Sequence, residues 1–319
     1  MNIIKQLFKE NLIQNTKNYF VLSEDSDDSN QHQVNDSYDF QWKLVNETKE
    51  RDTAWSFQKK WYLELYGFKT EENLAKFLQT KKVILDAGCG LGYKAAWFAE
   101  LAPNSCIIGI DYSDGALYAS EHFKDIENLV FVKGDIANTG FNNSVIDYIS
   151  CDQVLQHTES PKKTLIEFNR IMNNQGELAV YVYRKKALPR ELIDTYFRTE
   201  TKKISIEQKV KMSEQLTVLG KRLAALNVEI DVPEIPLLGI KGGKQDIQRF
   251  IYWDFLKCFW NDELGHDISV STNFDWYSPS NAARYSKSEF LKMLLDTKFK
   301  SPSFFREEEA CYTAIVKKS

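Results

Sequence analysis

Paired cysteines are missing from this chain of 319 residues. Its five cysteines are scattered, with no CxxC pair and no histidine at ligand spacing, and its four histidines are equally dispersed. Structural zinc sites and disulfide frameworks both depend on closely patterned cysteines. We therefore expect neither a metal site nor a disulfide framework, and free thiols without a secretory signal predict a cytoplasmic protein.

Long apolar runs and an excess of positive charge are missing too. Nowhere do eighteen uncharged apolar residues follow one another, so no membrane span is expected. The net charge is -4 and the pI about 5.8, whereas nucleic-acid binding depends on clustered Lys and Arg. No nucleic-acid partner is expected, and a small-molecule substrate is favoured. A homodimer is left open.

What the chain does have is an alternation of short β-branched runs with helical patterns in residues 76–186. This alternation is typical of crossover units in a parallel sheet. Ser160 and Pro161 predict a helix start, as a hydroxyl cap followed by proline in the first turn. The predicted strands are KVILDAG, CIIGID, LVFVKGD, IDYISCD and GELAVYVY.

The remaining zones flank or interrupt this region. Residues 187–284 are predicted to form a mostly helical insertion, which would act as a lid over the ligand edge of the sheet and would bind the substrate. One helical face of this insertion is formed by Leu216, Leu219, Leu223 and Leu226. Residues 285–319 return to the sheet through a capping box, Ser286 with Glu289, and an antiparallel hairpin. Residues 1–75 are expected to form an aromatic-rich cap segment. The predicted fold is α/β: a Rossmann-like, doubly wound, mostly parallel sheet.

A glycine loop follows the first predicted strand, in VILDAGCGLGYKAAWFAE. Gly88, Gly90 and Gly92 allow close backbone approach at a helix start, which is how a nucleotide site is built. A dinucleotide loop needs GxGxxG, but its third glycine would here be Tyr93. The pattern is instead DxGxGxG. Its acid, Asp86, would repel a pyrophosphate but would favour the ammonium and sulfonium of S-adenosylmethionine.

Two more acids close the next two predicted strands. Asp111 is placed to accept both ribose hydroxyls, as acids in NAD sites also do, so it does not discriminate between the two cofactors. Asp135 is placed to accept from an adenine amino group, and Ile136 can pack on the ring. Three acids and three glycines at successive strand ends point to one nucleotide site more strongly than a lone glycine triplet does.

With these residues in place, LDAGCGLG, IGIDYS, FVKGDI and IDYISCDQVLQH together resemble the class I S-adenosylmethionine-dependent methyltransferases. The resemblance covers residues 80–186 and implies S-adenosylmethionine as cofactor and S-adenosylhomocysteine as product. It also extends to the C-terminal hairpin and to NFDWYSPSNAARYSKSEF, which is similar to a tail of small-molecule methyltransferases, although Asn281 replaces the expected tyrosine. The cofactor residues implied are Asp86, Gly88, Gly90, Gly92, Asp111, Tyr112, Asp135, Ile136, Asp152 and Gln153.

Methyl transfer from a sulfonium needs mainly alignment, and needs a base only where the acceptor must lose a proton. His157 is the predicted base, because it follows the strand end where the methyl group would project and titrates near neutral pH. Asp152 is equally suited to cofactor binding. Polar and aromatic side chains are predicted to hold the substrate: Tyr38, Trp42, Trp276, Tyr277, Arg284 and Tyr285.

The sequence thus favours a methyltransferase acting on a small organic acceptor, with O-, N- or C-methylation open. One alternative is a catalytically silent cofactor-binding regulatory subunit. Another is an RNA or protein methyltransferase, against which the missing basic surface and the absence of an NPPY-type motif (here CDQV) both count. An NAD oxidoreductase is disfavoured by Asp86 and Tyr93.

Overall fold

The computed structural model describes residues 2–9, 12–22, 37–38 and 51–319. The chain divides into two compact units. The first unit comprises Met1–Asn35, Trp55–Arg184 and Ala283–Ser319, and the second comprises Asp36–Ala54 and Lys185–Ala282. The predicted insertion, residues 187–284, overlaps the second unit closely. Its role as a lid stays a prediction.

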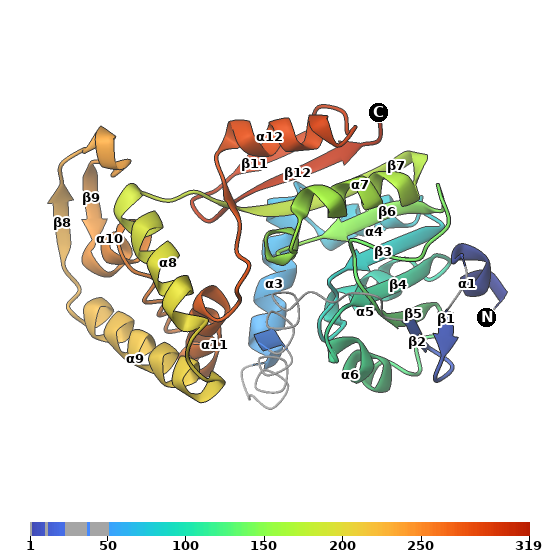
Figure 1. Ribbon diagram of the computed structural model, residues 1–319, viewed down its shortest axis with the longest axis horizontal. Helices are drawn as coiled ribbons and strands as arrows, with labels where there is room; N and C mark the ends of the chain where they lie inside the picture. Colours follow the sequence, from blue (N-terminus) through green and yellow to red (C-terminus); the bar gives the residue numbers. More distant parts are fainter. Residues whose placement is uncertain (1, 10–11, 23–36, 39–50) are drawn as a thin grey trace. The chain divides into compact units, whose positions relative to one another are not determined.

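The first unit is built on one large sheet (Figure 1). Its strand order is β1-β2-β5-β4-β3-β6-β7-β12-β11, and β10 also pairs with β7. The strands are β1 (Leu12–Gln14), β2 (Tyr19–Leu22), β3 (Val83–Ala87), β4 (Cys106–Asp111), β5 (Leu129–Lys133), β6 (Ile146–Cys151), β7 (Met172–Arg184), β10 (Arg284–Tyr285), β11 (Phe304–Glu307) and β12 (Cys311–Lys317).

Strands β2 to β7 of this sheet run parallel, and β12 pairs antiparallel with both β7 and β11. All five predicted strands are present, and the antiparallel C-terminal hairpin is confirmed. The chain leaves β3 toward β4 and β5 and then returns to the other side of β3 as β6. This reversal puts a topological switch point beside β3, where ligands bind in open α/β sheets.

Helices cover both faces of the sheet. Leu165, Phe168, Phe290 and Leu294 from α7 and α12 share a buried apolar cluster with the sheet, while α5 and α6 pack against strands β3 to β5. Ser160 and Ser286 cap α7 and α12, as predicted. The helices are α1 (Asn2–Leu7), α3 (Arg51–Leu65), α4 (Glu71–Leu78), α5 (Tyr93–Leu101), α6 (Gly115–His122), the 3-10 turn η1 (Leu155–His157), α7 (Pro161–Ile171) and α12 (Lys287–Asp296).

Part of the N-terminal region extends the main sheet. Within the predicted cap segment, residues 1–75, β2 pairs in parallel with β5 and β1 pairs with β2. Strands of three and four residues are too short to give a measurable period-two pattern, which is why the sequence did not reveal them.

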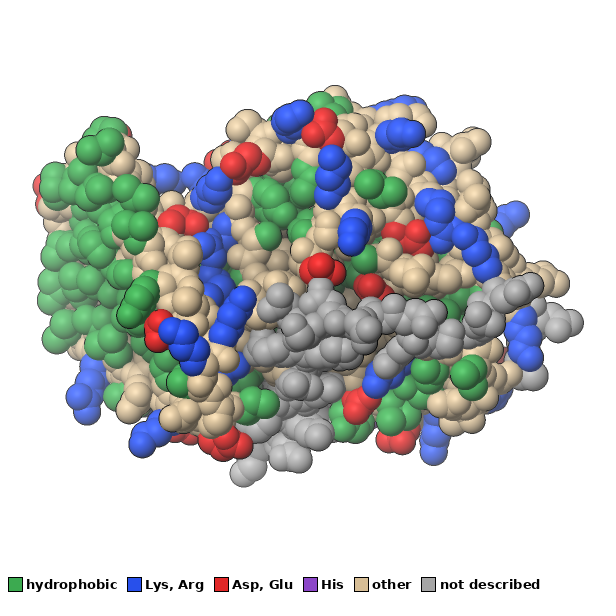
Figure 2. Space-filling model, viewed as in Figure 1, with side chains coloured by type: hydrophobic (Ala, Val, Ile, Leu, Met, Phe, Trp, Pro, Cys, Tyr) green, Lys and Arg blue, Asp and Glu red, His purple; other side chains and the backbone are tan. Residues whose placement is uncertain are grey.

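The second unit is mostly helical, with a two-stranded hairpin. Its elements are α8 (Leu188–Thr201), α9 (Ile206–Ala225), β8 (Glu229–Val232), the 3-10 turn η2 (Pro236–Leu238), β9 (Gly243–Asp246), α10 (Ile247–Asp254) and α11 (Gly265–Tyr277). Figure 2 shows hydrophobic side chains gathered on the surface of this unit, and Leu237 is 88% exposed.

The leucine pattern of the second unit did not predict its interior. Helix α9 is present, but Leu219 and Leu226 are exposed, and only Leu216 of the leucine stripe is buried. Lys209, Ser213 and Thr217 are buried on α9 instead. The inward face of α9 is therefore largely polar, and hydrophobic periodicity does not identify the buried face of this helix.

Candidate active site

The glycine loop joins β3 to α5 in a conformation that needs glycine. Gly88, Gly90 and Gly92 all have positive φ, of 78°, 50° and 78°. A Cβ on Gly88 would lie 2.4 Å from Cγ2 of Val154, so an alanine there would be both strained and overpacked. The loop is held in place by the N–H groups of Gly88 and Cys89, which donate to the carbonyl of Ile110 at 2.8 and 3.0 Å.

Asp111, at the end of β4, ties this loop to its neighbouring strand. Its Oδ2 accepts from the Gly90 N–H at 2.8 Å, and its Oδ1 accepts from the N–H and the hydroxyl of Ser113 at 2.9 and 2.5 Å. Burial raises the pKa of Asp111, and the hydrogen bonds from Ser113 and Gly90 oppose that rise. Each carboxylate oxygen has two acceptor sites, so Oδ2 keeps capacity for a ligand hydroxyl.

Asp86 is the most deeply placed acid of the site. It is fully buried in β3, and no described group donates a well-directed hydrogen bond to either oxygen, although Lys94 Nζ forms an ion pair with Oδ1 at 3.1 Å. Burial raises the pKa of Asp86, and Lys94 acts in the opposite direction. A buried carboxylate with free acceptor capacity is unusual and fits a site that binds a cation.

Lys94, in the first turn of α5, serves two carboxylates. Its Nζ also lies 3.9 Å from Oδ2 of Asp152, the residue that follows β6. Burial alone would lower the pKa of Lys94, but Asp86 and Asp152 outweigh it and raise the pKa. Because two carboxylates share one ammonium, the cluster of Asp86, Asp152 and Lys94 still favours an additional positive charge nearby.

Asp152 and Gln153 lie in the turn after β6, at the same edge of the sheet. The Tyr66 hydroxyl donates to Oδ1 of Asp152 at 2.9 Å, and the Gln153 amide donates to the side chain of Gln58 at 3.0 Å. Gln153 has a φ of 63°, a conformation that residues other than glycine adopt at a cost of about 1–3 kcal/mol.

Asp135 follows β5 and is half-buried. Its Oδ1 accepts from the N–H of Ala137 at 2.8 Å, which shapes the turn, and the neighbouring Ile136 is 6% exposed. Burial raises the pKa of Asp135. With Asp86 in β3 and Asp111 ending β4, the three predicted acids occur at the carboxyl ends of three adjacent parallel strands. Tyr112, directly after Asp111, is half-buried.

His157 is buried in η1, where its Nε2 lies 3.3 Å from the hydroxyl of Tyr183. Two predicted substrate residues reach the same place, because β10 pairs Arg284 with Tyr183 and Tyr285 with Arg184. Burial raises the pKa of Tyr285 to about 12. The structure thus brings the candidate base, Arg284 and Tyr285 together at the end of β7.

The other predicted substrate residues belong to the second unit. Trp276 and Tyr277 are buried, and both donate to the carboxylate of Asp194 at 2.9 Å. These contacts hold the two side chains inside the second unit, and their role in substrate binding stays a prediction. Tyr38 is half-buried, and Trp42 lies outside the described residues.

Sequence reasoning missed Lys94, Tyr66 and Gln58 as members of the site. Lys94 carried one signal: a cation in the first turn of a helix opposes the helix dipole, so it needs a compensating partner. Tyr66 and Gln58 come from a distant part of the chain, and their position depends on tertiary packing that no local pattern records.

Comparison with known proteins agrees with this geometry. Residues 78–238 match the family model described as a methyltransferase domain. An uncharacterised methyltransferase of Schizosaccharomyces pombe is 29% identical over 137 residues, 39% of this chain and 48% of that protein. A demethylmenaquinone methyltransferase of Staphylococcus aureus is 26% identical over 118 residues, 36% of this chain and 49% of that protein. The chain spans about half the length of these relatives.

Solved structures resemble the chain more distantly. Magnesium protoporphyrin IX methyltransferase from Synechocystis, with bound S-adenosylhomocysteine, is 15% identical with a TM-score of 0.45 and covers 90% of this chain and 98% of its own. An S-adenosylmethionine-dependent methyltransferase from Aquifex aeolicus is 14% identical with a TM-score of 0.43, covering 81% and 92%. None of the described helices combines the length and the apolar character that crossing a membrane requires.

The matching family model covers half of the chain and includes the glycine loop and the three acids at the strand ends. The chain belongs to the methyltransferase-domain family, the class I S-adenosylmethionine-dependent methyltransferases.

Proposed function

We propose that the protein transfers the methyl group of S-adenosylmethionine to a small organic acceptor. The observation that carries this proposal is the buried Asp86 carboxylate beneath the glycine loop, with acceptor capacity that the described residues leave unused. A cation suits this position, whereas a pyrophosphate would be repelled. The cofactor's ammonium and sulfonium meet that requirement, and the residues present therefore fit the group.

Each further acid has a defined role in this proposal. Asp111 would accept a ribose hydroxyl through the capacity left on Oδ2. Asp135 would accept from the adenine amino group, with Ile136 packed against the ring. Asp152 and Lys94 would orient Asp86, and Gln153 would be held toward the cofactor by its strained backbone.

When bound, S-adenosylmethionine supplies an electrophilic methyl group on a good leaving group. The protein's own contribution is alignment, worth several kcal/mol, and removal of a proton where the acceptor carries one. His157 would take that proton, and its contact with the Tyr183 hydroxyl would hold the ring in position. Arg284 and Tyr285 of β10, which pairs with β7 at Tyr183, would contact the acceptor.

The test measures S-adenosylhomocysteine formed when the full chain is incubated with S-adenosylmethionine and a panel of phenols, amines and carboxylic acids. Turnover with one of these compounds supports the proposal. Binding of the cofactor without turnover of any small molecule, peptide or RNA would favour the silent regulatory subunit instead. Turnover with RNA or protein alone would overturn the small-molecule assignment. Light scattering would test the homodimer that the sequence leaves open.

A further inference from the structure

Helix α8 of the second unit turns its charged face inward and its apolar face outward. Arg190, Asp194 and Arg198, spaced four residues apart, are 1%, 0% and 7% exposed, whereas Leu192 and Tyr196 are 63% and 64% exposed. A surface helix ordinarily buries its apolar stripe. Burial of apolar surface therefore does not explain why this helix presents its charges to the interior.

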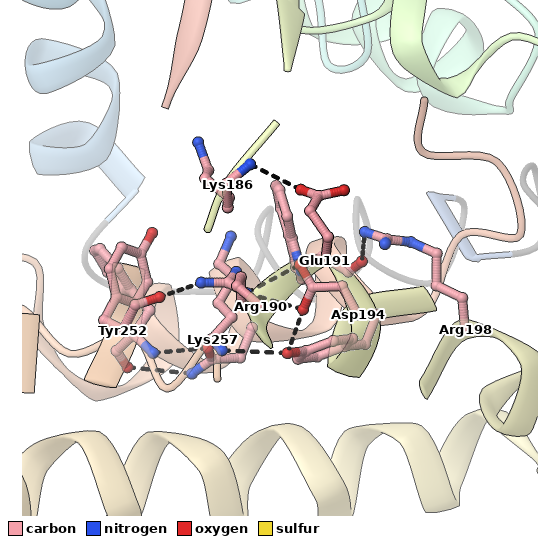
Figure 3. Close-up of polar contacts among 11 residues, drawn as sticks. Lys186, Arg190, Glu191, Asp194, Arg198, Tyr252 and Lys257 are labelled. Atoms are coloured by element: carbon pink, nitrogen blue, oxygen red, sulfur yellow. Dashed lines mark hydrogen bonds and ion pairs between the residues drawn. The ribbon is translucent and has the colours of Figure 1, made fainter. Parts of the chain in front are cut away.

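One of these charges is fully matched within the unit. Arg190 Nε donates to both oxygens of Asp194 at 2.9 Å, and its Nη1 donates to the carbonyl of Tyr252 (Figure 3). Asp194 also accepts from the indole of Trp276 and the hydroxyl of Tyr277. Four hydrogen bonds from three donor groups thus saturate Asp194, and its charge is balanced by Arg190.

Two further cations lie against the same indole ring. The Nζ of Lys257 is 4.4 Å from the centroid of Trp276 and the Cζ of Arg198 is 5.2 Å from it. Lys257 is 6% exposed, and within the described part of the chain its ammonium makes neither a hydrogen bond nor an ion pair. A nearly buried ammonium beside one aromatic face carries a desolvation cost that cation–π attraction of about 2 kcal/mol offsets only in part.

The pKa of Lys257 is set more by burial than by the charges around it. Burial lowers the pKa of Lys257 to about 7. The carboxylates of Asp275 and Asp194 oppose this shift, and the guanidinium groups of Arg190 and Arg198 add to it. An ordinary structural lysine would be better replaced by an apolar side chain at such a position. A bound anion, in contrast, would compensate the ammonium directly and raise its pKa again.

We propose that Lys257, together with Arg198, forms an anion-binding site in the second unit that takes the oxyanion of a small molecule, a carboxylate or a phosphoryl group. Arg198 supplies the planar guanidinium that suits either group, and Trp276 supplies a flat surface for the adjoining part of the ligand. The proposal concerns the second unit alone and does not depend on the methyl-transfer proposal.

The experiment follows thermal denaturation of the full chain with increasing phosphate, sulfate, acetate or benzoate, at an ionic strength held constant with sodium chloride. A ligand that binds only the folded protein stabilises it by RT ln(1 + [L]/Kd), so the rise in stability with ligand concentration gives an apparent Kd. The phosphate and sulfate arms identify a phosphoryl-type site, and the acetate and benzoate arms identify a carboxylate site.

Three variants make the result specific. Lys257→Met should weaken binding about tenfold or more, the loss expected for one charged hydrogen bond. Lys257→Arg keeps the cation and should bind nearly as wild type does. Lys211→Met removes an exposed lysine of α9 as a matched control and should change nothing. S-adenosylhomocysteine binding by each variant reports folding and tests the methyltransferase proposal separately.

The pH dependence adds a second readout. If only the charged form of Lys257 binds, sulfate affinity should fall about tenfold between pH 6 and pH 8. The charged groups facing Lys257 are Arg190, Asp194 and Arg198 from α8 and Asp275 from α11. Lys257→Arg should lose this pH dependence because guanidinium keeps its proton. Wild type that binds none of the four anions, or a folded Lys257→Met that binds within twofold of wild type, overturns the proposal.

Discussion

Replacing Lys94 by methionine removes the ammonium that is paired with the buried carboxylate of Asp86. The two groups lie 3.1 Å apart, with side chains 14% and 0% exposed. At an effective dielectric constant of about 20 their attraction is roughly 5 kcal/mol. Breaking a buried pair by removing one partner costs about 3–5 kcal/mol, because the remaining charge is left uncompensated. We expect Lys94→Met to lower the free energy of unfolding by that amount at pH 7.

The assay is urea denaturation followed by far-UV circular dichroism and tryptophan fluorescence. The double variant Asp86→Asn/Lys94→Met removes the stranded charge and should recover about 2 kcal/mol or more of the loss. Lys76→Met, which removes an exposed ion pair with Glu72, serves as control and should cost under about 1 kcal/mol.

The pH dependence of this loss has a definite sign. Burial raises the folded-state pKa of Asp86 above its unfolded value, so Asp86 makes the fold less stable as pH rises through that interval. Without Lys94 this pKa should rise further. The deficit of Lys94→Met should therefore be larger at pH 7 than at pH 5. A loss below about 1 kcal/mol, or no recovery in the double variant, would refute the view that Lys94 compensates Asp86.

Three other changes test separate parts of the structure. Gly88→Ala should cost about 2–4 kcal/mol of stability, because it adds a clash with Val154 to the strain of a positive φ. Gly239→Ala, at a φ of 68° with the Cα of Ala187 3.7 Å away, should cost only about 1 kcal/mol, and equal losses would speak against the clash. His157→Gln should reduce turnover about 100- to 10,000-fold with cofactor affinity retained, and unchanged turnover across pH would remove His157 as the base. Asp194→Ala should destabilise the second unit by about 3–5 kcal/mol in thermal denaturation; a loss under about 1 kcal/mol would contradict its role as the balancing charge.

Much of the first unit could be predicted from sequence because local pattern and tertiary position agree there. Strands β3 to β7 are apolar runs buried on both faces, and acids at their ends follow from the geometry of a parallel sheet. Ser160 and Ser286 mark helix starts through side-chain hydrogen bonds that depend only on neighbouring residues.

The remaining features of the site and of the second unit depend on tertiary contacts that no local sequence pattern reveals. Lys94 is recognised as part of the site only when α5 lies against β3. In the second unit, the buried polar residues of α8 and α9 run against the rule that leucines mark the buried face. Trp276 and Tyr277 were predicted to meet substrate because they are aromatic and polar-tipped. The same properties suit them to a buried carboxylate, and the pattern alone could not separate the two roles.

The most direct test of the account is calorimetric titration of the wild-type chain and of Asp111→Ala with S-adenosylhomocysteine and with NADH. We predict that wild type binds S-adenosylhomocysteine and not NADH. Asp111→Ala should lose about 1.5–3 kcal/mol of that affinity, because a charged hydrogen-bond acceptor is removed. Binding of NADH alone, or equal affinity of both proteins for S-adenosylhomocysteine, would contradict the assignment of the glycine loop and Asp111 to this cofactor.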